Sequence, residues 1–360
     1  MDLINATRMS AGYTMAMEPS GRELLVVVVK GTFHLPKPGE NVRLHEEQLP
    51  LIMADTFTGE PGLSAPVCEV DFALRKKRCD ILLVGSAHGS GGRPEKRVLV
   101  GLRVGSMTKT FSVVGNRHWR VGVSGVSASE PEPFTVMPIS YDRAFGGVDN
   151  RHEDAAKHVA FMRNPVGRGF HMHLRREWLD GAPLPNTEEA GHPIVQADGE
   201  YRPMSLGPIG RNWEPRFRYA GTYDQNWLDN VFPFLPSDFD EQYYQTAPLD
   251  QQIKGSVGGQ EVTLLNLTPD GRRDFVIPSF EAPVHVFPRG GGREDLPATL
   301  DTIVFEPGEE RFTITWRVAR PLKKSMHEIA QVVAGRHAAL PGRPVKLAMP
   351  AGHSQASLVA

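Results

Sequence analysis

The chain has 360 residues, of which 40% are hydrophobic and 23% charged, a balance typical of a folded globular protein and not of a disordered one. Its formal net charge is −2, so no long-range positive field favours nucleic acid as a partner. The N-terminus lacks the basic and apolar segments of a signal peptide. The longest apolar run, 24–29, is far shorter than the ~20 residues that cross a bilayer. We therefore expect a cytoplasmic protein that binds neither nucleic acid nor membranes.

The first third of the chain predicts an antiparallel meander. The full sequence contains 36 Gly and 30 Pro residues, which are spread along the chain and favour short strands joined by turns. Residues 24–35 open with a continuous apolar run, as expected for a strand buried on both faces. Val70, Phe72 and Leu74 alternate with Glu69, Asp71 and Ala73, which predicts a half-buried strand. Further strands are expected over 81–84, 98–104, 110–114 and 119–123, with Gly115-Asn116 as a tight turn between the last two.

Strands recur near the other end of the chain. The residues of 311–318 alternate between an apolar face and a polar face, and this segment pairs naturally with 303–305 as a hairpin. Other candidates are 262–267, 275–277 and 284–287. The fold class is therefore mainly β, with sandwich-like antiparallel sheets. We assign residues 1–322 to a single β-rich domain, although the pattern does not decide whether its two β-rich blocks form one sandwich or two domains.

Periodicity weakens over residues 130–255, where Pro, Gly, Asn and aromatic residues dominate. We interpret this region as a loop-rich insertion packed on the sheets, with a short helix that Ser237 caps and that ends near Thr246. Residues 323–345 predict an amphipathic helix, capped by Ser325, that packs on the domain. Its apolar stripe comprises Met326, Ile329, Ala330 and Val333, and the tail 346–360 should be frayed.

No group of residues stands out as catalytic or metal-binding. His171 and His173 are the best local metal pair, but no third ligand lies nearby, so ordinary surface histidines are the simpler interpretation. The glycine-rich loops at 89–94 and 290–292 lack the helix and lysine of a phosphate site, and a Gly-x-Ser-x-Gly nucleophile motif is absent. Cys68 and Cys79 do not form a disulfide framework. We predict no catalytic residue, no metal and no cofactor.

The insertion carries several short peptides in which turn residues stand beside aromatic residues and Arg–Asp pairs. One interpretation is a scaffold of ordered loops held by buried Arg–carboxylate pairs. The other is a rigid surface rich in aromatic residues and arginine, the composition that protein interfaces favour. Under the second interpretation, the partner-binding candidates are Arg143, Phe145, Arg211, Trp213, Tyr223 and Trp227.

These peptides, taken in order, resemble the DUF2169 family associated with bacterial type VI secretion. The resemblance rests on stretches such as 141–147, 164–170 and 207–213, together with 30–33 and 114–119, and it covers roughly residues 18–320. It implies an adaptor or chaperone that helps load a toxic effector onto the secreted spike, often an effector carrying a PAAR domain. The family is not usually regarded as enzymatic, so the resemblance supplies no catalytic residues.

Three hypotheses follow for function. The first is a non-catalytic adaptor that binds an effector, a PAAR or VgrG spike protein, or both, in an oligomeric state that the sequence does not reveal. The second is a hydrolase-like enzyme with a site on the loop-rich region, for which His171, His173, Asp238 and Asp240 would have to meet around one cavity. The third is a structural component of the secretion particle itself.

Overall fold

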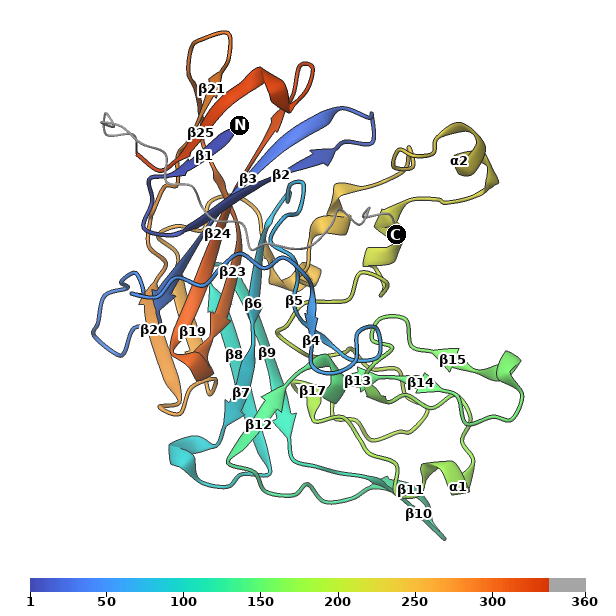
Figure 1. Cartoon of the computed structure of the whole chain (residues 1–360). Coiled ribbons are helices and arrows are strands. Elements are labelled where there is room, and N and C mark those ends of the chain that lie inside the picture. The colour runs from blue at the N-terminus through green and yellow to red at the C-terminus, as the bar shows by residue number, and fades with distance from the viewer. Residues whose placement is uncertain (337–360) are drawn as a thin grey trace.

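Two large sheets form the body of the protein. The computed structural model describes residues 1–336 (Figure 1). One sheet has six strands in the order β18-β6-β23-β24-β3-β2, and the other has five in the order β17-β9-β8-β19-β20. The strands of the first are β18 (Gln252–Ile253), β6 (Cys79–Leu83), β23 (Thr299–Glu306), β24 (Arg311–Pro321), β3 (Glu23–His34) and β2 (Ser10–Met17). Those of the second are β17 (Thr187–Glu189), β9 (Met107–Val114), β8 (Arg97–Val104), β19 (Glu261–Leu265) and β20 (Arg272–Val276).

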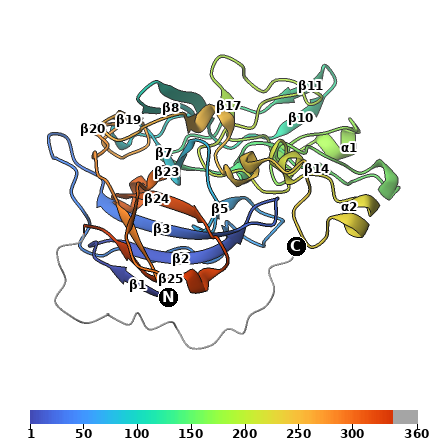
Figure 2. The same cartoon turned by 90° about the horizontal axis from the view of Figure 1, so that it is seen from above.

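The two sheets share one hydrophobic core, so the two β-rich blocks of the sequence meet in a sandwich. Phe275 of β20 packs against Phe305 of β23 and Phe312 of β24, with ring centroids 6.0 and 5.6 Å apart. Seen from above, β3 and β24 lie in one layer and β8, β19 and β20 in another (Figure 2). The β23–β24 hairpin is confirmed, and β23 also pairs in parallel with β6.

Strand β3 is buried on both faces, as its uninterrupted apolar run predicts. Leu25 and Val27 face a four-stranded sheet, while Leu24, Val26 and Val28 are covered by Leu74 and its neighbours. The four-stranded sheet has the order β1-β25-β21-β22, with bounds β1 (Asp2–Asn5), β25 (Ile329–Ala334), β21 (Val284–Pro288) and β22 (Glu294–Leu296).

The remaining strands form short pairs. They are β4 (Thr56–Phe57) with β5 (Pro66–Cys68), β7 (Gly85–His88) with β12 (Val136–Ile139), β10 (Trp119–Gly122) with β11 (Gly125–Ala128), β13 (Phe145–Gly146) with β16 (Arg168–Gly169), and β14 (Val148–Asp149) with β15 (Val159–Ala160).

Helices are few and short among the residues that the structure describes. The α-helices are α1 (Arg176–Leu179) and α2 (Gln225–Asn230). The 3-10 turns are η1 (Ser90–Gly92), η2 (Tyr141–Arg143), η3 (Ala155–Lys157), η4 (Arg216–Ala220), η5 (Glu241–Tyr244), η6 (Leu249–Gln251), η7 (Pro307–Glu309) and η8 (Met326–Glu328). Within residues 1–336, no helix is both long and apolar enough to span a bilayer. The mainly β fold class is confirmed.

The prediction of a strand around Val70, Phe72 and Leu74 is wrong. The segment contains no strand, because Asp71 turns inward and pairs with Lys30 of β3 at 3.0 Å. Phe72 and Leu74 also pack on β3, so this loop covers the strand with both acidic and apolar side chains.

One turn in the first third of the chain and one helix of the insertion also differ from expectation. Gly115-Asn116 does not join a hairpin, because β9 pairs with β8 and β17 while β10 pairs with β11. The helix expected from Ser237 is only the single turn η5, and Asp240, not Ser237, caps it by accepting the N–H of Gln242.

The prediction of a C-terminal amphipathic helix over 323–345 is wrong for the part that the structure describes, residues 323–336. Ser325 does cap a turn, but that turn is η8, and Ile329–Ala334 continue as strand β25. β25 lies between β1 and β21, and both neighbours supply backbone hydrogen-bond partners. Tertiary pairing therefore overrides the helical spacing of Met326, Ile329 and Val333. The rest of the predicted helix and the tail 346–360 lie outside the described residues.

Candidate protein-binding site

A loop of the insertion projects from the body and exposes apolar side chains. It runs from Gly221 to Asp238, carries α2, and is called here the aromatic arm (Figure 1). Four of its large side chains face solvent: Tyr223, Leu228, Phe232 and Phe234 are 52, 53, 53 and 42% exposed. Single exposed apolar residues are ordinary on protein surfaces, but several on one projecting loop mark a candidate binding site.

Trp227 organises the arm from within. Asp224 caps α2 by accepting the Trp227 N–H at 2.8 Å. The indole lies 4.7 Å from the Tyr223 ring and 5.6 Å from the Phe232 ring, centroid to centroid, and both contacts are edge-on. Its Nε1–H donates to the Phe234 carbonyl at 2.9 Å. The exposed side chains are therefore attached to an ordered loop.

Hydrogen bonds close the base of the arm. The Asp238 carboxylate accepts from the backbone N–H of Thr222 at 3.0 Å and from its hydroxyl at 2.7 Å. The backbone N–H of Thr222 is the main reason that the pKa of Asp238 lies below its usual value, so this acid is ionised at neutral pH. Gly221 has a φ of +86°, and a Cβ there would lie 2.8 Å from both Pro236 Cβ and Asp238 Oδ1. Glycine is therefore required at this corner.

Phe234, near the base of the arm, also packs on the body at Gly21, in the turn between β2 and β3. A Cβ at Gly21 would lie 2.9 Å from Phe234 Cε1, so the missing side chain is what lets the phenyl ring approach. The arm also has a single sign of charge: it contains Asp224, Asp229 and Asp238 and no Lys or Arg. The surface that it presents is aromatic and acidic.

The six residues predicted to bind a partner divide between the arm and the interior. Tyr223 and Trp227 lie on the arm, the first exposed and the second half-buried. Phe145 and Trp213 are 1 and 2% exposed and pack edge-on against Phe161 and Tyr141, respectively. Their aromatic character therefore belongs to the core of the insertion.

The two arginines of the set have structural partners. Half-buried Arg143 donates to Asn186 Oδ1 at 3.1 Å. Arg211 lies between Asp55 and Glu69, at 3.0 and 3.5 Å, with 39% of its side chain exposed. Sequence reasoning missed Leu228, Phe232 and Phe234. The dense apolar composition of 227–235, which begins within the Asp-capped helix α2 and continues past its end, is the signal that could have found them.

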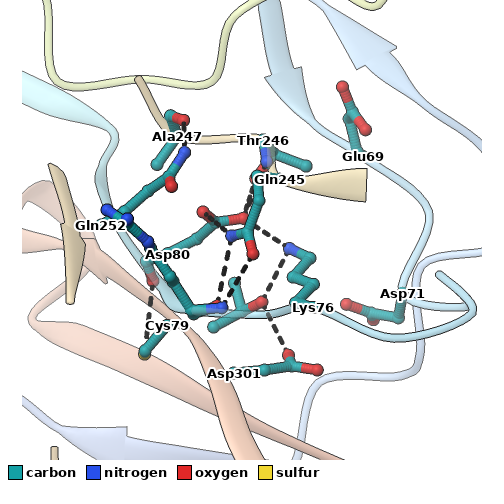
Figure 3. Close-up of polar contacts among 12 residues, drawn as sticks. Glu69, Asp71, Lys76, Cys79, Asp80, Gln245, Thr246, Ala247, Gln252 and Asp301 are labelled. Carbon is teal, nitrogen blue, oxygen red and sulfur yellow. Dashed lines mark hydrogen bonds and ion pairs between the residues drawn. The ribbon is translucent and has the colours of Figure 1, made fainter. Parts of the chain in front are cut away.

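A second cluster of polar residues lies inside the protein, where the insertion meets the six-stranded sheet (Figure 3). Fully buried Asp80 of β6 accepts from Lys76 Nζ at 2.7 Å and from Gln245 Nε2 at 2.7 Å. It also accepts the backbone N–H and the hydroxyl of Thr246, at 2.7 and 3.0 Å. Lys76 donates in addition to Thr302 of β23 at 2.9 Å. Each charge in this cluster has an opposite charge or several dipoles around it, which is how buried ions persist in a folded protein.

The same interior holds more ion pairs and a small cavity. Buried Arg317 pairs with Asp301 at 2.7 Å, and Arg216 binds the Glu69 carboxylate with two nitrogens. A cavity of about 200 Å³ lies beside these pairs and is lined by Lys30, Lys76, Arg317 and Cys68 among others. Burial raises the pKa of the Cys68 thiol, so it stays protonated and is a poor nucleophile at neutral pH.

The four residues that the hydrolase hypothesis would bring together have separate partners. His173 lies 3.2 Å from Asp149, Asp238 binds Thr222, and Asp240 binds Lys77 at 3.0 Å. His171 lines a cavity of about 600 Å³ whose lining, within residues 1–336, does not include the other three. Burial lowers the pKa of His171, which leaves it neutral at pH 7.

Comparison with protein-family models matches residues 20–317 to DUF2169, described as an uncharacterized protein conserved in bacteria. The chain belongs to the DUF2169 family. The match includes the five-stranded sheet, the six-stranded sheet without β2, the aromatic arm and the buried cluster around Asp80, and it ends within β24. A search of curated proteins and a search of solved structures each found no match.

Proposed function

We propose that this DUF2169 protein is a non-catalytic adaptor that binds a type VI secretion effector, through the effector itself or its PAAR-linked segment, before loading onto the spike. The observation that carries the proposal is the aromatic arm, an ordered loop whose large apolar side chains are presented to solvent. The resemblance described above implies the class of partner, and the arm supplies a surface suited to holding a protein.

The composition of the arm fits a binding site. Interface energy concentrates in a few aromatic side chains that become desolvated on binding. Aromatic side chains have few rotatable bonds, and a preorganised loop loses little conformational freedom when a partner docks. The internal contacts of Trp227 and the bonds of Asp238 provide that preorganisation.

The negative charge of the arm indicates which kind of partner surface would be complementary to it. Asp224, Asp229 and Asp238 give it a negative field with no basic residue to offset it. Complementary potential favours a partner surface that is apolar at its centre and carries Lys or Arg at its edge. We therefore infer that the bound segment of the effector or of its PAAR-linked region is basic and apolar.

Co-purification with each effector encoded near the gene tests the proposal. In the test variant Leu228→Ser and Phe232→Ser remove two side chains that are each 53% exposed. In the matched control Leu63→Ser and Val195→Ser remove two that are 72 and 60% exposed and lie outside the arm. We expect the arm variant to lose effector binding by about tenfold or more, since an interface anchor contributes ~2 kcal/mol or more, and the control to bind normally.

Unchanged binding by a folded arm variant would contradict the proposal, as would equal losses in the two variants. Failure of the wild-type chain to co-purify with every neighbouring effector would count against the adaptor itself. The structural-component hypothesis predicts another outcome, namely recovery of the protein in secreted material at a fixed ratio to the spike.

A further inference from the structure

A histidine pair lies where the chain leaves β3 and turns back along it. Phe33 and Leu44 form an antiparallel bridge. Backbone hydrogen bonds flank the bridge, from His34 N to Arg43 O at 3.0 Å and from His45 N to Thr32 O at 2.8 Å. The backbone positions of both histidines are therefore fixed, although they are eleven residues apart in the sequence.

The pairing places both imidazoles on one face. Side chains alternate along paired strands, and Phe33 and Leu44 point into the core. His34 and His45 consequently point the other way and are diagonal neighbours across the bridge. Their rings stack with centroids 4.2 Å apart and planes inclined by 23°.

Glu46 completes the cluster. Its Oε2 lies 2.6 Å from His34 Nε2, and one donor atom from each of the three side chains falls within 4.8 Å of the other two. In a tetrahedral zinc site with bonds of ~2.0–2.1 Å, neighbouring donor atoms are about 3.3 Å apart. The three donor atoms therefore have to move closer by at most about 1.5 Å to reach that spacing.

We propose that His34, His45 and Glu46 bind one divalent cation of borderline softness, with Zn²⁺ as the representative, and that water occupies the fourth position. Two imidazoles and one carboxylate form a donor set that zinc uses, whereas Mg²⁺ and Ca²⁺ prefer oxygen donors alone. The bound cation would join the end of β3 to residues 43–46.

The contacts that a cation must displace are exposed. The cation replaces the hydrogen bond between His34 and Glu46. If His45 binds the cation through Nδ1, the cation also displaces the backbone N–H of Glu47, which donates to this nitrogen at 3.0 Å. Arg43 Nη1 lies 3.2 Å from Glu46 Oε1, the carboxylate oxygen that does not contact His34. The side chains of Arg43 and Glu46 are 65 and 70% exposed, so both are free to rearrange.

Calorimetric titration with Zn²⁺ tests the site on full-length protein previously dialysed against a chelator. We expect one saturable site per chain. Each of the substitutions His34→Asn, His45→Asn and Glu46→Gln should weaken binding by at least about tenfold, the loss that even outer partners of a metal ligand cause. The matched control His118→Asn removes an exposed histidine elsewhere and should leave the affinity unchanged.

A second readout identifies the donors directly. Co²⁺ bound in place of Zn²⁺ should give the visible absorption of a four-coordinate ion in the wild type and lose it in a His34→Asn, His45→Asn double variant. Circular dichroism establishes that each variant is folded. The proposal is wrong when the wild type shows no saturable site, or when the folded double variant binds Zn²⁺ as tightly as the wild type.

Discussion

Asp80 is the residue on which the junction between sheet and insertion depends. It has no exposure to solvent, and Lys76, Gln245 and Thr246 all donate to its carboxylate. Gln245 and Thr246 lie in the last part of the insertion, so the buried carboxylate of Asp80 fixes that part of the chain against β6. The same residue also keeps Lys76, only 5% exposed, beside an opposite charge.

Asp80→Asn should therefore destabilise the whole protein. The substitution leaves the Lys76 ammonium buried without its counter-ion, which typically costs ~3–5 kcal/mol. Urea denaturation measures the loss. The matched control is Asp274→Asn, since Asp274 pairs with Arg272 where the two side chains are 53 and 61% exposed, and such a pair contributes at most ~1 kcal/mol. If the two substitutions lowered the free energy of unfolding equally, the buried pair would contribute no more to stability than the exposed pair.

At the scale of single residues, composition did not distinguish exposed aromatic side chains from buried ones. Tyr223 and Trp213 both stand in short aromatic peptides rich in turn residues, yet one is 52% and the other 2% exposed. The difference arises from Tyr141, which packs against Trp213 from 72 residues earlier in the chain. Burial that depends on such distant contacts cannot be deduced from local pattern.

Among the elements, those with an uninterrupted apolar run or strict alternation were predictable. β3 opens with a continuous apolar run and β24 alternates strictly over residues 311–318, and both strands were identified. β25 was not, because the spacing of Met326, Ile329 and Val333 also fits one face of a helix. Its neighbours β1 and β21 come from the N-terminus and from residue 284 onward, and their free edges decide the outcome.

One arginine joins the elements at this end of the molecule. Arg320 of β24 binds Glu294 of β22 at 2.6 and 2.9 Å and Glu328 of η8 at 2.7 Å. The hydrogen bond from Arg320 holds the pKa of Glu294 below its usual value of 4.5. The native state thus binds the Glu294 proton less readily than the unfolded chain does. The stabilisation is complete above the unfolded pKa and is lost as pH falls through the lower native pKa.

Glu294→Gln should reduce the pH dependence of stability in the acid range. Denaturation at about pH 6 and about pH 3 compares the ionised and protonated states of this carboxyl. The variant should be less stable than the wild type at the higher pH, and the gap should narrow at the lower pH. If the difference in stability between variant and wild type were the same at both pH values, the charge of Glu294 would not contribute to stability.

For the whole molecule, the fold separates a body of packed sheets from the projecting aromatic arm. The sandwich joins strands far apart in sequence, such as β6 with β23, and this is why the sequence could not decide between one sandwich and two domains. The insertion is fixed to that sandwich by Asp80 and its partners. The aromatic arm extends from the insertion (Figures 1 and 2). Its side chains of Tyr223, Leu228 and Phe232 are each more than half exposed to solvent.

Site-specific photo-crosslinking in cells that express the effectors tests this account most directly. A crosslinking residue is placed at Leu228 on the arm or at Leu63 outside it, two positions that are 53 and 72% exposed. We expect illumination to join the chain to an effector or its PAAR-linked segment from position 228 and not from position 63. Capture of the effector from position 63 alone would contradict the assignment of the arm as the binding surface.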